Sequence, residues 1–279
     1  MEPRSRSFYA LAAFFALFLA FLYGPTITIA ILSFQGPGGG LTFPMRGVST
    51  YWFRDLFEQQ AVGDIWGSFR RSFVLGLIVM VTTVVVSVMG GLAFRKRFPG
   101  STVLFYLIIT SLVIPSILVS LGVGLIWSQS GLPVHWSTSG LGAQLTWTLP
   151  FGLLIMFAVF NRFDASFEEA ARDLGATPWQ VIRHVVLPII APSLIGVALF
   201  GFTLSYDEFA RTLLTAGSSN TLPLEIFGMT TNVTSPVIYA LGTLTTIFSF
   251  LVIGVFLSIV WLTDRRRKKR GSDAGKGMV

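Results

Sequence analysis

Few residues of this chain could carry chemistry, and most of them lie in two short stretches between apolar runs. The first is residues 168–188, EEAARDLGATPWQVIRHVVLP, and the second is residues 206–208, YDE. The sequence contains no cysteine, which excludes disulfides, thiolate catalysis and cysteine-ligated metal sites. Its two histidines, His135 and His184, leave little for a metal cluster. We therefore expect no catalytic residue and no metal site in this chain.

Tyr206, Asp207 and Glu208 are candidates for a substrate pathway, because they follow directly after an apolar run. Ionisable groups at membrane depth are costly and usually face a cavity or a partner. Asp207 or Glu208 could then line the route of a cationic substrate. The alternative is that one of them pairs with Arg211, at i+4 or i+3 on a continuing helix. The sequence leaves both interpretations open.

Membrane spans must position these residues. The chain of 279 residues is 53% hydrophobic and 12% charged, which is about half the charged share of soluble domains. Apolar runs long enough to cross a bilayer recur along it. We expect an all-α membrane protein, a single transmembrane domain over 1–279, with six spans at about 8–32, 71–94, 102–127, 143–160, 189–210 and 237–262.

Three prolines, Pro25, Pro115 and Pro150, lie within or near these predicted spans. Proline is tolerated in membrane helices because neighbouring helices can satisfy the freed carbonyl groups. The six spans are therefore expected in spite of them.

The basic residues divide unevenly between the two sides of the membrane. With the N-terminus in the cytoplasm, the outside set is small: Arg46, Arg54, Arg70, Arg71 and Arg211. The cytoplasmic set is three times larger: Arg4, Arg6, Arg95, Lys96, Arg97, Arg162, Arg172, Arg183, the run RRRKKR at 265–270, and Lys276. This asymmetry predicts that both termini are cytoplasmic. The run at 265–270, in a basic tail at 263–279, is then a topology anchor or, alternatively, an anionic-lipid site.

Residues 161–188 form the one sizeable cytoplasmic loop expected between spans. Ser166 and Glu169 have the spacing of a capping box, which predicts the start of a short helix. Gly175 occupies the position where a left-handed residue ends such a helix. The apolar face of this helix is expected to be Phe167, Ala170, Ala171 and Leu174.

A second helix start follows the glycine. Thr177 is a capping residue, Pro178 takes the first helical position, and Gln180 closes a second capping box. The residues expected to share one face of this helix are Trp179, Ile182 and Val186. The segment is either an ordinary interfacial helix pair that caps the bundle or a docking element for a partner protein.

One pattern in this loop resembles a known motif. Glu169-Ala-Ala-x-x-x-Gly175, then nine residues, then Val185-x-Leu187-Pro188 is similar to the EAA loop of bacterial ABC importer permeases, with Val185 in place of the usual isoleucine. FTLSYDEF at 202–209 and TAGSSNTLPLEIF at 215–227 look like the spermidine/putrescine permeases of the C-component type.

The resemblance implies a six-span subunit of the bacterial inner membrane that forms half of a translocation pathway. It implies three protein partners: a dimeric ABC ATPase, a second permease subunit and a periplasmic solute-binding protein. ATP and magnesium would be bound by the ATPase, so that this chain has no cofactor of its own. The residues that the resemblance assigns to ATPase coupling are Glu168, Glu169, Ala170, Ala171, Asp173, Leu174, Gly175, Ala176, Pro178 and Trp179.

The sequence departs from the polyamine pattern in one place. After Ser235-Pro236 such relatives often carry Glu and then Asn, whereas this chain has Val237 and Tyr239. The solute therefore stays open between a polyamine-like cation and another small organic solute such as an opine or a phosphonate.

Two other classes of protein are weighed against the importer. No G-x-x-x-x-G-K-[ST] sequence occurs, so any ATPase must be a separate chain. An intramembrane protease would need Ser and His at facing depths, and His135 and His184 are expected in loops on opposite sides. An ion-coupled secondary carrier is the other alternative, and no inverted repeat supports it.

Overall fold

The computed structural model describes residues 5–58, 63–96, 98–232 and 235–274, and these are almost entirely helical. The elements are α1 (Arg6–Leu32), α2 (Tyr51–Glu58), α3 (Ile65–Phe94), α4 (Ser101–Val113), α5 (Ser116–Gln129), the π-helix η2 (Trp136–Gly140), α6 (Leu141–Asn161), α7 (Ser166–Asp173), α8 (Pro178–Val181), the π-helix η3 (Ile182–Val186), α9 (Leu187–Tyr206), α10 (Leu222–Asn232) and α11 (Val237–Ala274). Within the described ranges no β-strand occurs, and the one bridge joins Gln35 to Val48. The predicted all-α class is confirmed. Arg4, Arg97, Lys276 and the end of the basic tail lie outside the described residues.

Five helices are long and apolar enough to cross a membrane. They cover Arg6–Leu32, Ile65–Phe94, Trp136–Asn161, Pro178–Tyr206 and Val237–Thr263. Five of the six predicted spans coincide with these helices, although the predicted span 189–210 runs four residues beyond the end of α9. A sixth span is counted if the bent pair α4 and α5 is taken as one.

The predicted span at 102–127 is not a single straight helix, because the chain breaks at Pro115. Helices α4 and α5 are bent by 109° relative to each other. Ile114 is extended, with φ −67° and ψ 128°, as the residue before a proline prefers. Pro115 is itself extended and precedes the first turn of α5. Pro25 and Pro150, by contrast, lie inside the uninterrupted helices α1 and α6.

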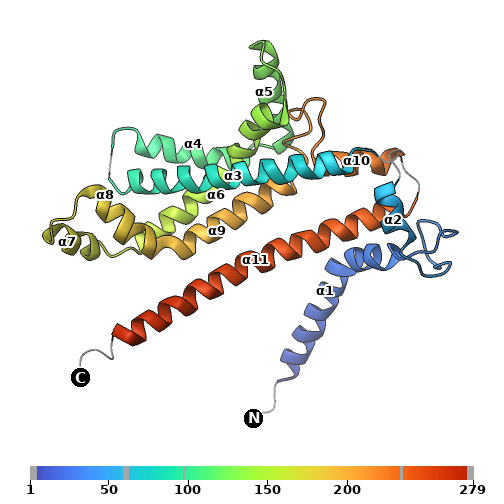
Figure 1. Ribbon diagram of the computed structural model, residues 1–279, viewed down its shortest axis with the longest axis horizontal. Coiled ribbons are helices and arrows are strands. Elements are labelled where there is room, and N and C mark those ends of the chain that lie inside the picture. The colour runs from blue at the N-terminus through green and yellow to red at the C-terminus, as the bar shows by residue number, and fades with distance from the viewer. Residues whose placement is uncertain (1–4, 59–62, 97, 233–234, 275–279) are drawn as a thin grey trace. The chain divides into compact units, whose positions relative to one another are not determined.

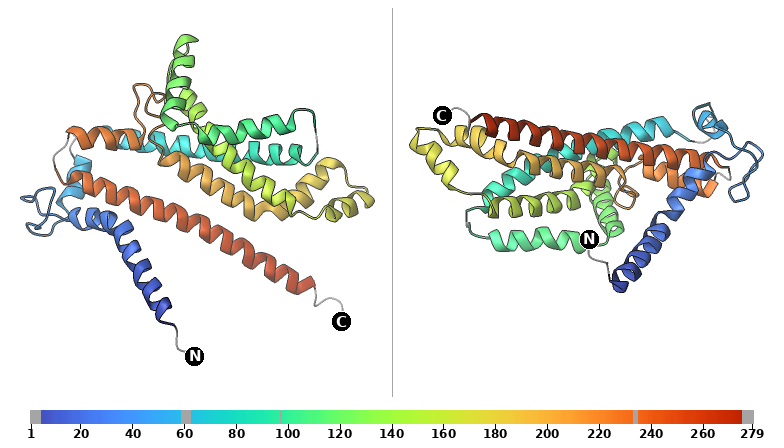
Figure 2. Two further views of the ribbon diagram at one scale, coloured as in Figure 1. Left: turned by 180° about the vertical axis from the view of Figure 1, so that it is seen from behind. Right: turned by 90° about the horizontal axis from the view of Figure 1, so that it is seen from below.

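The chain forms two compact units, one made of Met1–Gly63 and Ile226–Leu251, the other of Asp64–Glu225 and Val252–Val279. In the second unit α3 packs against α6 and α9, and α6 packs against α9. Figures 1 and 2 show these three helices side by side, with α4 beside them and α5 turned away. The short helices α7 and α8 lie beyond one end of the three. This arrangement positions both candidate sites.

Small residues let these three helices approach closely. A Cβ atom on Gly201 of α9 would lie 3.2 Å from the Cα of Met80 in α3, so a larger side chain would force the helices apart. The Thr83 hydroxyl donates to the Thr148 hydroxyl at 3.0 Å and links α3 to α6 in the buried interior. Small interface residues and interhelical hydrogen bonds are what holds helices together where lipid removes the hydrophobic driving force.

In the first unit, the glycine-rich stretch after α1 folds around a buried glutamine. The side chain of Gln35 donates to the Gly40 carbonyl at 3.1 Å and accepts from the Arg46 amide at 2.8 Å. The short helix α2 of the same unit buries Trp52 and Leu56.

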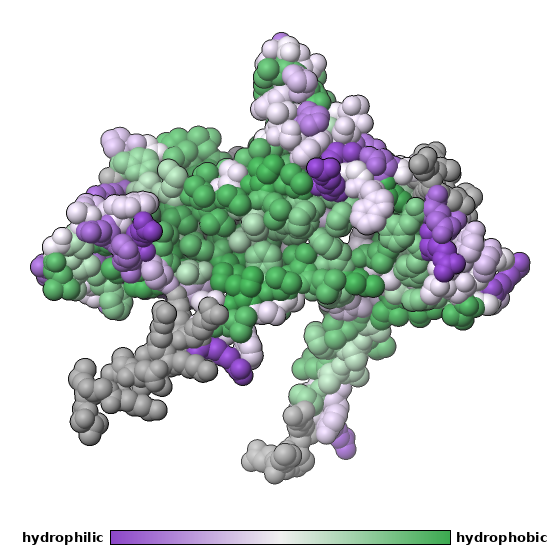
Figure 3. Space-filling view, viewed as in Figure 1, coloured by the Kyte–Doolittle hydropathy of each residue, from purple (hydrophilic) through white to green (hydrophobic). Residues whose placement is uncertain are grey.

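The surface of the second unit is strongly apolar along its long helices. In Figure 3 hydrophobic side chains cover the visible faces of α4, α6 and α9, and hydrophilic side chains gather over α7. An apolar surface of this kind is expected on helices that face lipid or a partner within the bilayer.

Candidate functional site

Helix α7 begins with a cap that differs from the prediction. Ser166 is the first helical residue, and the residue at the N-cap, Ala165, makes no side-chain hydrogen bond to the helix. The carboxylate of Asp164 instead accepts from the Ser166 amide at 2.9 Å. This hydrogen bond lowers the pKa of Asp164. The predicted capping box of Ser166 and Glu169 is therefore wrong, since the acid two residues earlier takes over the capping role.

The turn after α7 is the one predicted. Gly175 has φ +83°, in the left-handed region that only glycine adopts without cost. Its amide donates to the Arg172 carbonyl at 2.8 Å, and the Ala176 amide donates to the Ala171 carbonyl at 3.0 Å. This pair of bonds is a Schellman motif. It ends α7 sharply.

Helix α8 also starts as predicted. The Thr177 amide donates to Gln180 Oε1 at 2.8 Å, and the Gln180 amide donates to Thr177 Oγ1 at 3.4 Å. Pro178 occupies the first turn. The capping box therefore fixes where the second helix begins, two residues after the glycine turn.

The face that α7 turns inward shares only Ala171 with the predicted apolar face. Phe167 is 54% exposed and Leu174 is 90% exposed, whereas Glu168 is only 7% exposed. Arg95 Nη1, at the end of α3, donates to Glu168 Oε1. Arg172 Nη2 donates to Glu168 Oε2 at 3.1 Å. A carboxylate held by two guanidinium groups can be buried at a tolerable cost, and this charged contact sets the orientation of α7.

The guanidinium of Arg95 is itself held in place by aromatic rings. It lies 5.3 Å from the ring centroids of both Phe160 and Phe163, at the end of α6. Cation–π contacts of this kind stabilise a charged group next to apolar side chains. Arg95 thus joins α3, α6 and α7. Sequence patterns indicated only that it lies at the cytoplasmic end of a span.

The second short helix is packed through η3. Val181, Val186 and Ile190 are buried in one cluster with Met156 and Phe160 of α6. Val181 and Val186 are five residues apart, the spacing of a π-helix, and the Leu187 amide bonds back to the Ile182 carbonyl as a π turn requires. Of the predicted face Trp179, Ile182 and Val186, only Val186 is fully buried. Trp179 is 64% exposed.

The residues assigned to coupling by resemblance therefore have different environments. Most of them are exposed: Glu169, Ala170, Asp173, Leu174, Gly175, Pro178 and Trp179. Ala171 and Ala176 are partly buried against the cluster below, and Glu168 is buried. The outer side of the segment thus presents large apolar side chains, Phe167, Leu174 and Trp179, among charged ones.

The second candidate group lies where α9 ends. Tyr206 is the last helical residue and is buried, with its ring stacked 5.8 Å from that of Phe202. Asp207 is exposed. Glu208 faces inward and forms an ion pair of 3.8 Å with Arg211, whose amide also donates to Glu208 Oε1 at 2.9 Å. The alternative of structural pairing therefore holds for Glu208, although the pair forms in the turn after α9 and not on the continuing helix that was predicted.

Arg211 has a large set of partners for a side chain that is 3% exposed. Its Nη1 donates to the Ser116 hydroxyl at 2.7 Å, and its Nε donates to the Thr146 hydroxyl at 3.3 Å. Its guanidinium also lies 4.6 Å from the ring centroid of Trp147. Because Ser116 is the first residue of α5, Arg211 holds the chain just after the break at Pro115.

Among the residues that the structure describes, no three His, Cys, Asp or Glu side chains gather in a way that could hold a metal ion.

The sequence comparison decides the family. Residues 84–269 match the model of the family described as "Binding-protein-dependent transport system inner membrane component". The chain belongs to this family. It is therefore an inner-membrane permease component of a transport system rather than an enzyme, and the family resemblance stated from the EAA pattern is confirmed.

Individual permeases of the family are similar over most of the chain. The spermidine/putrescine permease protein PotC of Haemophilus influenzae is 27% identical over 247 residues, 88% of this chain and 94% of that protein. The putrescine permease protein PotI of Escherichia coli K12 is 27% identical over 263 residues, 90% of this chain and 89% of that protein.

Solved importer structures share the fold. A bacterial ABC transporter chain involved in importing the acidic polysaccharide alginate has a TM-score of 0.69 at 20% identity, with 93% of this chain and 98% of that chain covered. A chain of the MetNI methionine ABC transporter has a TM-score of 0.54 at 19% identity, covering 71% and 94%. The two candidate groups thus lie on the fold of an importer permease.

Proposed function

We propose that this permease subunit works in an ATP-driven importer and that the 161–188 segment couples it to a separate ATPase. The first helix of the segment, α7, ends at the Gly175 turn. The second, α8, begins at the Thr177 capping box. Helix α8 continues through η3 into α9 without a break. A force applied to α8 is therefore transmitted directly to a membrane helix that packs on α3 and α6.

The observation that carries this proposal is the exposure of large apolar side chains on the segment. Phe167, Leu174 and Trp179 are 54%, 90% and 64% exposed, although the segment has a buried face available on its other side. Exposed apolar residues next to charged ones are typical of surfaces that bind another protein. The acidic residues Glu169 and Asp173 add a charge pattern that a partner can recognise.

The rest of the assembly follows from the family and from the named relatives. We propose a second, homologous permease subunit, a dimeric ATPase that binds ATP and magnesium, and a periplasmic binding protein. The single permease domain has both termini and the 161–188 segment on the cytoplasmic side, as the distribution of basic residues predicts.

The proposed solute is a polyamine or a similar small organic cation. The similarity to PotC and PotI over most of the chain supports this, and the substitutions at Val237 and Tyr239 leave an opine or a phosphonate as the alternative. For the pathway we propose Asp207, since it is exposed while Glu208 is paired and Tyr206 is buried. Asp207→Asn should then raise the apparent KM for spermidine, and unchanged uptake kinetics would remove Asp207 from the pathway.

The test of coupling compares substitutions within the segment. Gly175→Pro removes the amide that bonds to Arg172 and cannot adopt φ +83°, so it should abolish uptake while membrane insertion persists. Glu169→Lys should do the same by reversing an exposed charge. Gly175→Asn is the matched control, because a Cβ at this position meets nothing within 4 Å and asparagine tolerates the left-handed region.

The readouts are uptake of radiolabelled spermidine and recovery of the ATPase when the complex is purified in mild detergent. Normal uptake in both Gly175→Pro and Glu169→Lys would contradict the coupling role. Glu58→Lys, at an exposed acid on α2, controls for charge reversal as such. Uptake that survives ATP depletion but collapses with an uncoupler would instead support an ion-coupled carrier.

A further inference from the structure

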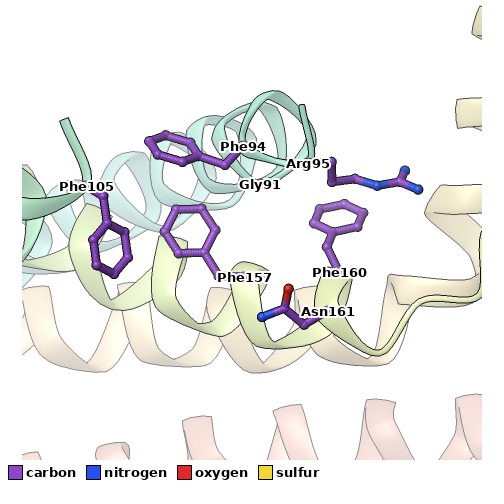
Figure 4. Close-up of a pocket in the computed structure, with 7 residues that line it drawn as sticks. All are labelled: Gly91, Phe94, Arg95, Phe105, Phe157, Phe160 and Asn161. Atoms are coloured by element: carbon purple, nitrogen blue, oxygen red, sulfur yellow. The ribbon is translucent and has the colours of Figure 1, made fainter. Parts of the chain in front are cut away.

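A pocket of about 420 Å³ opens between the ends of α3, α4 and α6, beside the contact of Arg95 with Glu168 and away from the 206–211 group. Its lining residues are Gly91, Phe94, Arg95, Phe105, Phe157, Phe160 and Asn161. Figure 4 shows the phenyl rings of Phe94, Phe105 and Phe157 toward one end and Arg95, beside Phe160, toward the other, with Asn161 between them. The pocket is thus amphipathic along its length.

The apolar end is built by rings from three different helices. The ring centroids of Phe94 and Phe157 are 4.9 Å apart, and those of Phe105 and Phe157 are 5.8 Å apart. Gly91 provides the room, because a Cβ there would lie 2.7 Å from the Phe160 ring. An alkyl chain placed among such rings meets apolar side chains, as it does in the hydrocarbon of the bilayer.

The polar end carries an excess of positive charge. Arg95 and Arg172 share the single carboxylate of Glu168, which leaves one positive charge uncompensated within this cluster. A quarter of the Arg95 side chain is exposed, so its guanidinium can be reached from outside. Lys96 and Arg162 lie next to the pocket residues Arg95 and Asn161 in the chain and are exposed. This end therefore favours an anion and disfavours a cation.

The depth of the pocket fits a lipid. Arg95 is the residue at the end of α3, and Asn161 is the last residue of α6, so the basic end lies where membrane helices emerge from the bilayer. Phe105 and Phe157 lie four residues inside the ends of α4 and α6, on the side of the hydrocarbon region. A lipid of that leaflet has its phosphate at the level of the basic end of the pocket and its acyl chains at the level of the aromatic end.

We propose that this pocket binds one anionic phospholipid, with an acyl chain among Phe94, Phe105 and Phe157 and its phosphate on Arg95. Arginine suits this role because its planar guanidinium can donate two parallel hydrogen bonds to phosphate oxygens while it stays stacked on an aromatic ring. The pocket so occupied is a binding site distinct from the 206–211 group and from the exposed surface of α7 and α8.

The first test measures lipid retention by native mass spectrometry of the assembled transporter complex. The complex is exchanged into equal amounts of phosphatidylglycerol and phosphatidylcholine with identical acyl chains. We expect retention of phosphatidylglycerol over phosphatidylcholine. Arg95→Gln should reduce this preference about tenfold, whereas Arg183→Gln, at an exposed arginine of η3, should leave it unchanged. Equal retention of the two lipids, or an unchanged preference in Arg95→Gln, would overturn the proposal.

A second variant guards against misfolding, because Arg95→Gln also leaves Glu168 with one partner fewer. Arg95→Gln with Glu168→Gln removes both charges and keeps hydrogen-bonding groups at both positions. It should fold, as judged by an apparent Tm near that of the wild type, and should still lose the preference. A preference that survives in this folded double variant would contradict a phosphate on Arg95.

The third measurement identifies the occupant. A benzoylphenylalanine photocrosslinker in place of Phe105 should capture a lipid in the assembled complex. Capture of another polypeptide would show that the pocket is a subunit interface and would overturn the proposal. Glycerol phosphate should not displace the lipid at millimolar concentration, and displacement would show that the site recognises a free phosphate without an acyl chain.

Discussion

Glu168 and Arg211 are both charged and both buried, and they lie toward opposite ends of α6, yet they are neutralised in different ways. Glu168 is a carboxylate between two guanidinium groups, one from α3 and one from its own helix. Arg211 is a guanidinium with one carboxylate, two hydroxyl groups and the face of an indole ring. The first cluster has a surplus of charge, and the second is balanced.

Because of this difference, the ion pair of Arg95 with Glu168 can be replaced by another contact, whereas the ion pair of Arg211 with Glu208 cannot. If an anion replaces Glu168 on Arg95, Glu168 still keeps Arg172, which is 57% exposed, so the contact can be remade at a modest cost. Among the described residues, Glu208 has no second basic partner that could replace Arg211, whose side chain is 3% exposed. We infer that the α7 end of the molecule can move relative to α3 and that the chain around Arg211 keeps one arrangement.

The largest effect is expected at Arg211. Arg211→Met leaves Glu208 as a nearly buried carboxylate without its counter-charge and should cost about 3 kcal/mol. The apparent Tm of the purified complex measures this, with Arg54→Met, at an exposed arginine of α2, as the control. The double variant Arg211→Met with Glu208→Leu should be more stable than Arg211→Met alone. If Arg211→Met is as stable as Arg54→Met, the ion pair of Arg211 with Glu208 does not hold this part of the chain in place.

An intermediate effect is expected at Glu168, and a double-mutant cycle isolates it. Glu168→Leu and Arg95→Leu should each destabilise the complex, and their coupling energy should be about 1 kcal/mol. Arg172→Leu should cost less than Arg95→Leu because its side chain is 57% exposed against 25%. A coupling energy near zero would mean that the contact between α3 and α7 does not hold the segment.

The smallest effect is expected at Asp64, an exposed acid that serves as a reference for both clusters. The hydrogen bond from Arg71 lowers its pKa, helped by the Gly67 amide. Its side chain is 63% exposed, so Asp64→Asn, which can keep the cap on α3, should cost less than about 0.5 kcal/mol.

The pH dependence at Asp64 has a defined sign. A lowered pKa in the folded protein means that the stabilisation is present above the ordinary carboxyl pKa and is lost as the pH falls through the lowered value. The Tm difference between the wild type and Asp64→Asn should therefore shrink in acid, and also in 1 M salt. A difference that grows in acid would refute the pairing with Arg71.

Local features of the site were predictable from sequence because their causes lie within a few residues. The glycine turn at Gly175 and the capping box of Thr177 and Gln180 follow from short spacings, whereas the sequence left the partner of Arg211 open between Asp207 and Glu208. The apolar runs likewise predict the membrane helices, since one long stretch of side chains determines each.

Features that depend on distant contacts were not predictable. The inward face of α7 is decided by Arg95, which is 73 residues from Glu168, and no spacing rule reaches that far. Pro115 interrupts its span while Pro150 does not, because Pro115 starts a new helix whose first residue, Ser116, is held by Arg211. The same residue type thus has opposite outcomes in two surroundings.

The π-helix η3 has a consequence for how insertions and deletions in this region act. A π turn holds one residue more than an α turn, so it is equivalent to a single inserted residue in an otherwise continuous helix. Deleting one residue from 182–186 would convert the π turn into an α turn and leave the direction of Thr177 and α8 nearly unchanged, because a π turn absorbs its extra residue over the same rotation. A deletion from the regular helix α9 would instead rotate α8 and Trp179 by about 100° about the helix axis.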